Sequence, residues 1–298
     1  MRSSQRPPLK YPYEYVCVYD LETIVDEEMP DGSFPPWPRH RPVAGAFLTA
    51  EWSPVGYSFK FDTLLCREGR EAEFYRKIDS LLPSGGMGVS LNGRNFDNAV
   101  LRLQAQRNGL FDLRNIARQS ESGRFDVAHL DLMDVFGGGR GTSLAELCRA
   151  LDIPVKTYVT GGDVAGLWKS GNLAAIKAYV QEDVIATYIL HLHAAAWREG
   201  HERQLVLPLA DLAAWIEGEP GLRHLLPFAT CRPAKWARSR APALRAAAAL
   251  ADADPRMESD RAFEQDQLVV ERGIEEMRVE FEIDRGLELF EQWDQRLP

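Results

Sequence analysis

Residues 15–22 read YVCVYDLE, a run of β-branched, aromatic and apolar residues that ends on two acids. This composition is typical of a buried β-strand. Because side chains alternate between the two faces of a strand, Asp20 and Glu22 are expected on the same face, near the strand's end. Two adjacent carboxylates repel each other unless a cation lies between them. The pair is therefore a candidate metal site, and two solvated acids at a strand end are the simpler alternative.

The elements expected after this strand indicate a mixed sheet flanked by helices. Strands are predicted at 43–52, 55–65, 87–92 and 127–132, and helices at 70–82, 95–109, 143–152 and 173–197. The stretch 26–42 is rich in Pro, Asp and Gly and is expected to be a long loop. Three strands followed by alternating helices and strands predict an α/β domain over residues 14–203.

The two ends of the chain have a different character. Residues 1–13 form a Pro-rich leader, and residues 204–298 are expected to form a mostly helical accessory region. Within that region, residues 220–251 carry basic residues and Trp236 but no acid, whereas residues 252–298 are acidic. The basic stretch could follow a phosphate backbone with the indole on a base, or it could dock on the acidic tail. The acidic stretch suggests a surface for a protein partner or for self-association.

Composition places the chain among soluble globular proteins. Of its 298 residues, 45% are hydrophobic and 27% charged. Neither an apolar leader nor a run of about 18 apolar residues occurs, so neither a secretory signal nor a membrane span is expected. Four scattered cysteines without a C-x-x-C pair suggest reduced thiols in a cytoplasmic protein. The net charge of −9 lies entirely after Ala251, where 15 acids and 6 bases occur, so it does not oppose a nucleic-acid substrate for the rest.

Two further segments place single acids where a site could use them. In LNGRNFDNAVL (91–101), Asp97 stands in the first turn of a predicted helix, where an acid also commonly complements the helix dipole. In AYVQEDVIATY (178–188), Tyr179 and Asp183 are four residues apart and share one helix face. An acid on a largely apolar helix needs a partner, which a divalent cation or a salt bridge would supply.

The order of these segments carries a resemblance that none of them has alone. VYDLET (18–23), LNGRNFDNAVL, AHLDLMDVF (128–136), SLAELCRALDIP (143–154) and the segment from Gly161 to Leu190 together resemble the DEDD exonucleases of the ribonuclease H-like fold. Tyr179, four residues before Asp183, matches the DEDDy branch, since the DEDDh branch would need a histidine where Ala178 stands. Over about residues 15–193 the chain is similar to the predicted 3′–5′ exonucleases related to the proofreading domain of family B DNA polymerases.

The resemblance implies a two-metal site with two Mg²⁺ or Mn²⁺ ions, which prefer carboxylate oxygens. It implies that Asp20 would bridge the ions, that Glu22 and Asp183 would bind the ion carrying the attacking water, and that Asp97 would hold the second. Tyr179 would orient the water. The implied activity is removal of nucleotides from the 3′ end of single-stranded nucleic acid, with DNA favoured over RNA.

Several alternatives stay open beside this prediction. The chain could be a binding or scaffold protein with a degenerate nuclease fold, or a trans-acting proofreading subunit of a replication or repair assembly. Asn92, Arg94 and Phe96 are candidates for contact with the terminal nucleotide, with packing as the alternative. His129 is expected to be a hydrogen-bonded core residue, and Asp163 the N-cap of a helix.

Overall fold

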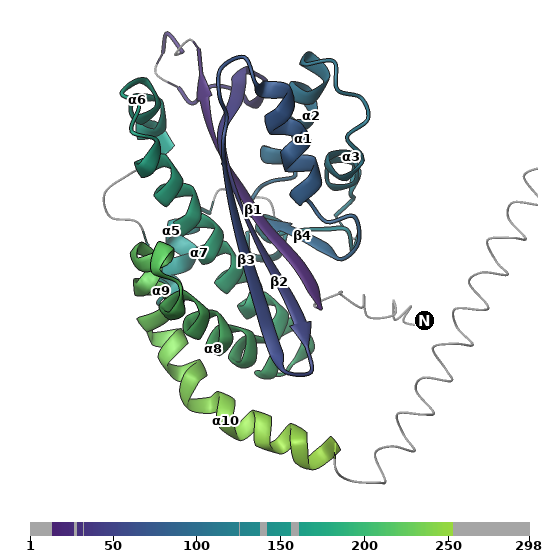
Figure 1. Ribbon diagram of the computed structural model, residues 1–298, viewed down its shortest axis with the longest axis vertical. Helices are drawn as coiled ribbons and strands as arrows, with labels where there is room; N and C mark the ends of the chain where they lie inside the picture. Colours follow the sequence, from purple (N-terminus) through teal and green to yellow (C-terminus); the bar gives the residue numbers. More distant parts are fainter. Residues whose placement is uncertain are drawn as a thin grey trace, which may run out of the picture. The chain divides into compact units, whose positions relative to one another are not determined.

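The computed structural model describes residues 14–26, 29–31, 33–124, 126–137, 142–155 and 161–252 (Figure 1). The chain divides into two compact units, one ending at Ala241 and one beginning at Pro242. The predicted leader (1–13) and the acidic stretch after residue 252 lie outside the described residues.

The predicted mixed sheet is confirmed, and with it the ribonuclease H-like α/β fold class. Its strands in the described chain are β1 (Tyr15–Val25), β2 (His40–Ser53), β3 (Gly56–Leu65), β4 (Met87–Ser90) and β5 (His129–Asp131). They lie in the order β3-β2-β1-β4-β5. β1, β2 and β3 pair antiparallel, whereas β4 pairs parallel with both β1 and β5. β1 is therefore central, and its carboxyl end points the same way as those of β4 and β5.

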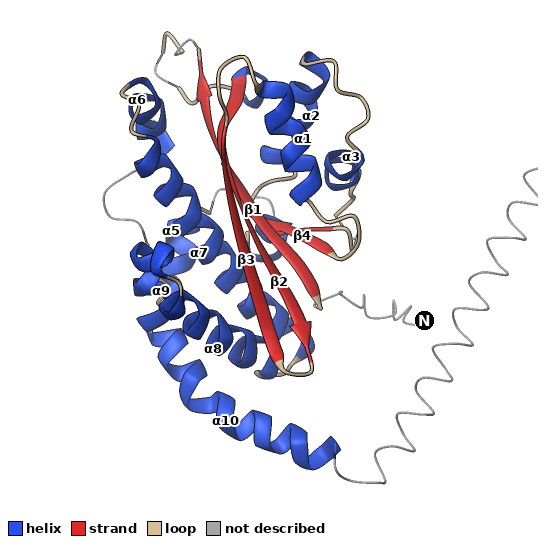
Figure 2. Cartoon of the chain, viewed as in Figure 1, coloured by secondary structure: helices blue, strands red, loops and turns tan. Residues whose placement is uncertain are grey.

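Helices cover both faces of this sheet (Figure 2). They are α1 (Glu71–Leu81), α2 (Asp97–Arg107), α3 (Arg114–Glu121), α4 (Leu132–Phe136), α5 (Leu144–Ala150), α6 (Val164–Lys169), α7 (Leu173–Glu199), α8 (Arg203–Gly218), α9 (Leu226–Thr230) and α10 (Arg232–Asp252), with short 3₁₀ turns η1 (Trp37–Arg39), η2 (Gly161–Asp163) and η3 (Pro220–Leu225). α1, α2 and α3 lie on one side, and α7 with α8 on the other. None of the described helices has both the length and the apolar character that a membrane span needs.

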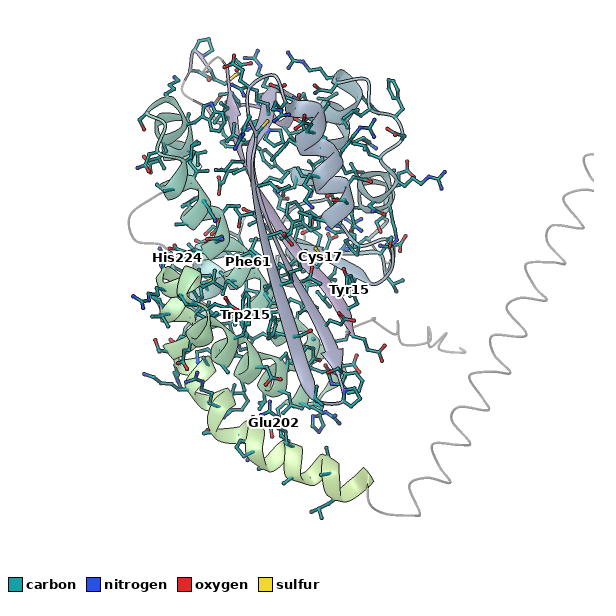
Figure 3. The ribbon with its side chains drawn as sticks, in the orientation of Figure 1. Tyr15, Cys17, Phe61, Glu202, Trp215 and His224 are labelled. Carbon is teal, nitrogen blue, oxygen red and sulfur yellow. The ribbon has the colours of Figure 1, made fainter. Side chains whose placement is uncertain are left out.

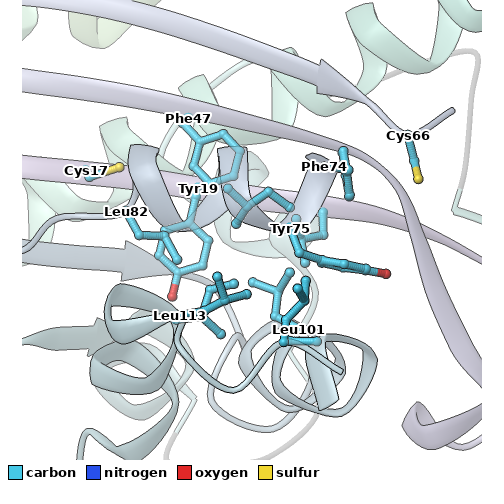
Figure 4. Close-up of a cluster of buried hydrophobic side chains, with 14 residues drawn as sticks. Cys17, Tyr19, Phe47, Cys66, Phe74, Tyr75, Leu82, Leu101 and Leu113 are labelled. Atoms are coloured by element: carbon cyan, nitrogen blue, oxygen red, sulfur yellow. The ribbon is translucent and has the colours of Figure 1, made fainter. Parts of the chain in front are cut away.

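The alternation along β1 separates a hydrophobic core from an acidic face. Cys17, Tyr19 and Leu21 point into a buried cluster with Phe47 of β2 and side chains of α1 and α2 (Figure 4). The Tyr19 hydroxyl donates a 2.6 Å hydrogen bond to Asn98 Oδ1 inside this core. Because neighbouring residues on a strand face opposite ways, Asp20 and Glu22 lie on the face that α7 covers.

A β-bulge interrupts the β1–β2 pairing at the acidic end of β1. The register shifts between Glu22, opposite Ala44, and Thr23, opposite Pro42. Proline has no N–H for the ladder, so a bulge is a position where a strand tolerates it. β2 begins at His40, so residues 40–42, which the sequence assigned to the loop 26–42, belong to this strand. The short turn η1 lies in the loop just before it.

The region after residue 203 contains longer helices than its prolines suggest. α8 runs for 16 residues through Pro208, and α10 for 21 residues through Pro242. Pro208 has no N–H and so removes one hydrogen bond from α8. The burial of Leu209, Leu212 and Ile216 on the same helix offsets this loss. α8 packs on β3, where Trp215 meets Phe61 and Phe59 (Figure 3).

Three arginines of the predicted basic stretch pair with acids of the first compact unit. Arg232 meets Asp152 at 2.8 Å, Arg240 meets Glu202 at 2.5 Å, and Arg238 pairs with Glu217. The sequence offered a phosphate backbone or the acidic tail as partners, and these contacts are with neither. The contacts of Arg232 and Arg240 link residues after 203 to acids before it, and the boundary that the sequence placed after residue 203 stays a prediction.

Candidate active site

Three predicted acids meet where β1 passes beneath α7. One carboxylate oxygen from each of Asp20, Glu22 and Asp183 lies within 4.8 Å of the other two. Glu22 is buried, with 6% of its surface exposed, and the other two are partly buried. Strand parity brings the first two together, and the packing of α7 on β1 supplies the third from a residue over 160 positions away.

Contacts that do not involve these carboxylates fix α7 against the sheet. Gln181, two residues before Asp183, is buried and donates through Nε2 to Thr63 Oγ1 of β3 at 2.8 Å. At the start of α7 the Asn172 side chain accepts from the Ala175 amide. Val180 and Val184, which flank the acid on the helix, are fully buried. The rotation of α7 about its axis is thereby set, and Asp183 faces the acids of β1.

Tyr179 lies one helical turn before Asp183 and faces the same acids. Burial raises the pKa of its phenol, and the charges of Asp183, Glu22, Asp20 and Asp163 raise it further in that order. The hydroxyl is therefore protonated at neutral pH and is able to donate a hydrogen bond. A general base must accept a proton, so a phenol that stays protonated cannot act as one. It can still orient a water molecule through a hydrogen bond.

Asp97 is not a member of this three-acid cluster. It is 4% exposed at the start of α2, and the nearby backbone N–H groups of Asp97 itself and of Leu21 act to lower the pKa of its carboxyl. β4 pairs with β1 only as far as Val18, which leaves the β1 edge at Leu21 open to this contact. Burial first, and then the nearby Asp131 charge, raise the pKa of Asp97 to about 7. Its carboxylate thus lies against the backbone between Asp20 and Glu22.

The loop that presents Asp97 is held by Asp131, a residue that the sequence did not single out. Asp131 ends β5 and is 2% exposed. Its carboxylate accepts from the backbone amides of Asn92 at 2.7 Å and Arg94 at 2.9 Å, and it also caps α4 through Met133. The available signal in the sequence was an acid inside the otherwise apolar strand expected at 127–132. Burial raises the pKa of Asp131 as well.

Glycine is required at the centre of the same loop. A Cβ on Gly93 would lie 2.0 Å from Ser90 Oγ and 3.5 Å from Asp97 Oδ2, so no larger residue fits. Asn92 before it adopts a φ of 65°, in the left-handed region that asparagine tolerates better than most residues. The segment NGRNFD is thus shaped to bring Asp97 beside β1.

The three candidate substrate residues of this loop have different surroundings. The Arg94 side chain binds other residues of the protein. Its Nε contacts Asp134 Oδ2 at 3.2 Å, and its guanidinium also donates to the Ser122 carbonyl. The Asn92 side chain accepts from Asn95. Phe96 is partly exposed and meets the His40 ring edge-on, with ring centroids 4.9 Å apart.

Two lesser predictions can be checked in the same region. His129 is 1% exposed and shares a 2.9 Å hydrogen bond with Ser90 Oγ, as expected of a core residue. Burial lowers the pKa of His129 to about 3, so the ring is neutral. Asp163 occupies the N-cap of α6, but its side chain does not make the capping hydrogen bond. Instead its charge acts on Tyr179.

The chemistry of the donors fits a hard divalent cation. Carboxylate oxygens are the ligands that Mg²⁺, Mn²⁺ and Ca²⁺ prefer, whereas structural zinc sites use mainly sulfur and nitrogen. The side chains of Asp20, Glu22 and Asp183 supply such oxygens at a spacing that one ion can span.

A separate cavity of about 440 Å³ opens beyond the end of β1. Arg41, Tyr75, Arg107 and Trp168 are among its lining residues, together with three acids. None of the predicted metal ligands lines it, so the chemistry described above lies elsewhere.

Two comparisons found similarity to known proteins, one with a family and one with a solved structure. Residues 32–230 match the family described as a predicted 3′–5′ exonuclease related to the exonuclease domain of PolB. Among solved structures, the chain is similar to the family B DNA polymerase from the hyperthermophilic archaeon Pyrobaculum calidifontis, at 17% identity and a TM-score of 0.38. That similarity covers 76% of this chain and 28% of the polymerase, so the chain spans less than a third of the polymerase's length. No curated protein matches the chain.

Proposed function

We infer that this chain, which belongs to the family of predicted 3′–5′ exonucleases related to the exonuclease domain of PolB, hydrolyses phosphodiester bonds from the 3′ end of single-stranded nucleic acid. DNA is the favoured substrate over RNA. The observation that carries the proposal is the meeting of Asp20, Glu22 and Asp183 within 4.8 Å beneath Tyr179.

The four acids and the tyrosine would divide the work as in the DEDDy branch. Asp20, Glu22 and Asp183 would hold one cation, and Asp97 would contribute to a second, partly through water, because its carboxylate is not in the three-acid cluster. When bound, two Mg²⁺ or Mn²⁺ ions would lower the pKa of a bound water and stabilise charge at both ends of the displacement.

Tyr179 would hold the attacking water by donating a hydrogen bond from its phenolic hydroxyl, which keeps its proton. The raised pKa of the phenol supports this role, because the hydroxyl keeps its proton at every pH at which such an enzyme works. The burial of Glu22 supports its proposed role as a cation ligand. A carboxylate with 6% exposure is poorly solvated, so it gains more from a bound cation than a surface acid would.

The test is digestion of 5′-labelled single-stranded DNA, duplex DNA and RNA by the full chain with Mg²⁺ or Mn²⁺. We expect a ladder shortening from the 3′ end, fastest on single-stranded DNA, that EDTA stops. Asp20→Ala and Asp183→Ala are expected to abolish the ladder, and Tyr179→Phe to leave a fraction of the activity.

Glu182→Gln is the matched control, because Glu182 precedes Asp183 on α7 and points about 100° away from it. It should retain wild-type cleavage. Full cleavage by Asp183→Ala, or equal loss in both variants, would refute the assignment of the site.

A further inference from the structure

The sheet ends on one side at β3, which is the edge strand beyond β2 (Figure 1). Within the described chain, no strand pairs with β3 on its outer side. β3 is 10 residues long, and its ladder to β2 runs along its whole length. An edge strand presents a row of backbone N–H and C=O groups that can pair with another strand. The length of β3 makes it a candidate interaction surface.

The hydrogen bonds at the two ends of β3 show which residues turn their backbone outward. In an antiparallel pair, alternate residues bond to the neighbouring strand. The Tyr57 amide turns away from β2 and donates to Asp211 Oδ2 of α8 at 3.1 Å. The Cys66 amide, just after β3, donates to the Val43 carbonyl of β2 at 2.8 Å. Odd-numbered residues of β3 therefore face outward, and because Asp211 occupies the first of them, the open part of the edge consists of Phe59, Phe61 and Thr63.

The side chains of this open edge divide between the two faces of the sheet. Phe59 and Phe61 meet Trp215 of α8, with ring centroids 5.5 and 6.5 Å apart, and both are only partly buried. Lys60 and Asp62 lie on the opposite face, because side chains alternate along a strand. Lys60 Nζ contacts Asp62 Oδ2 at 2.8 Å, and the lysine side chain is 69% exposed. The open edge thus carries a positive and a negative charge on either side of Phe61.

A second copy of the chain matches this order of charges. When two β3 strands pair antiparallel about a two-fold axis at Phe61, each Lys60 faces Asp62 of the partner subunit. An axis at Lys60 or at Asp62 would bring like charges together instead. With the axis at Phe61, the outward backbone groups form the hydrogen-bonded pairs. The charged residues then occupy the positions between them, where opposing side chains lie closest.

The charges on β3 also have a simpler explanation, which Lys60 alone would support. A lysine on an edge strand commonly prevents pairing with other strands. Asp62 alters this effect, because the two charges together disfavour the registers centred on either of them and favour the one centred on Phe61. A foreign strand would have to carry the same order of charges, whereas a second copy always does.

We propose that the outer edge of β3 is a homodimer interface, in which two chains join their sheets antiparallel through residues 59–63 about a two-fold axis at Phe61. The partner is a second copy of this chain. β2 separates β3 from the strand that carries Asp20 and Glu22, so the interface does not rest on the proposed function.

The test is sedimentation equilibrium of the full-length protein from about 1 to 100 μM, because an interface of one short ladder is expected to be weak. Wild type should become dimeric as its concentration rises. Lys60→Glu and Asp62→Lys each bring like charges together at two symmetric positions, so each should raise the dimer Kd roughly 10- to 100-fold. The double variant Lys60→Glu/Asp62→Lys restores opposite charges and should dimerise like wild type. An equal mixture of the two single variants should form a heterodimer.

Arg102→Glu is the matched control, because Arg102 is exposed on α2, which packs on α3 and β2. It changes the net charge as Lys60→Glu does and should leave the dimer Kd unchanged. A second measurement needs no variant. Hydrogen exchange of residues 57–65 in wild type should slow as the concentration rises, because the amides of Phe59, Phe61 and Thr63 enter new hydrogen bonds.

Wild type that stays monomeric over the whole range would overturn the proposal. So would a dimer that survives both single variants, or a double variant that folds and does not recover the dimer, since the charges would then not set the contact. Hydrogen exchange of β3 that does not change with concentration would overturn it as well, because any dimer would then form elsewhere. If a variant fails to fold, the exchange measured in wild type still decides the question.

Discussion

Asp97→Asn is expected to change how stability depends on pH. In the folded protein the pKa of Asp97 is raised from 3.8 to about 7, first by burial and then by the Asp131 charge. The neutral carboxyl is thus favoured in the folded state. Its contribution to stability is fully present below about pH 4 and is lost as the pH rises to about 7.

The size of the effect follows from the same shift. Converted at about 1.4 kcal/mol per pKa unit, the difference between 3.8 and about 7 corresponds to roughly 4 kcal/mol. Asparagine has nearly the same shape and stays neutral throughout this range. Relative to wild type, the free energy of unfolding of Asp97→Asn should therefore rise by up to about 4 kcal/mol between pH 4 and pH 8. Any fixed cost of the amide cancels in this comparison across pH.

The measurement is urea unfolding in EDTA, followed by tryptophan fluorescence at several pH values. Asp112→Asn is the control: Asp112 is exposed and Arg76 lowers its pKa, so its contribution changes only below about pH 4. Added Mg²⁺ or Mn²⁺ at pH 8 should stabilise wild type more than Asp97→Asn, because a cation favours the charged carboxylate. If the difference between Asp97→Asn and wild type stays flat from pH 4 to pH 8, burial does not control the charge of Asp97.

Three further predictions concern stability. Tyr19→Phe removes the buried hydrogen bond to Asn98 and should lower the free energy of unfolding by about 1–2 kcal/mol in urea titration; no loss would show that water replaces it. Gly86→Ala should cost about 1–3 kcal/mol and lower Tm, because φ is 70° and a Cβ would lie 2.5 Å from the Tyr15 carbonyl oxygen. A chain that ends at residue 203 should lose cooperative thermal unfolding, because it lacks the helix α8 that covers β3; a sharp transition at the wild-type Tm would contradict this.

The sequence was sufficient for the parts of the fold that depend on local patterns. Strand parity placed Asp20 and Glu22 on one face, and the four-residue spacing placed Tyr179 beside Asp183. Helices α1, α2, α5 and α7 and the five strands were predicted within a few residues. These features follow from periods of 2 and 3.6 residues, which the sequence displays directly.

Other features depend on contacts between distant segments, which no local pattern reveals. The short helices α3 and α4 were not predicted, and α4 took the end of the strand expected at 127–132 because Asp131 caps it. The role of Asp131 in holding the Asp97 loop arises from partners nearly 40 positions away. The prolines after residue 203 suggested short helices, but in α8 burial against the sheet outweighed the hydrogen bond lost at Pro208. The hydrogen bond between His40 and Thr23 and the contact of the His40 and Phe96 rings likewise join separate segments of the chain.

The anchors of the acidic site determine how its variants should be interpreted. β1 is fixed by its ladders to β2 and β4, α7 by its buried face and by Gln181 on Thr63, and the Asp97 loop by Asp131. None of these anchors uses the carboxylates of the three-acid cluster. The elements that carry the acids are therefore held in place by packing and hydrogen bonds before any cation binds, which reduces the ordering that binding has to supply. In the Asp183→Ala variant these anchors stay in place, so a loss of cleavage with unchanged thermal unfolding would support the proposed role of Asp183 as a metal ligand.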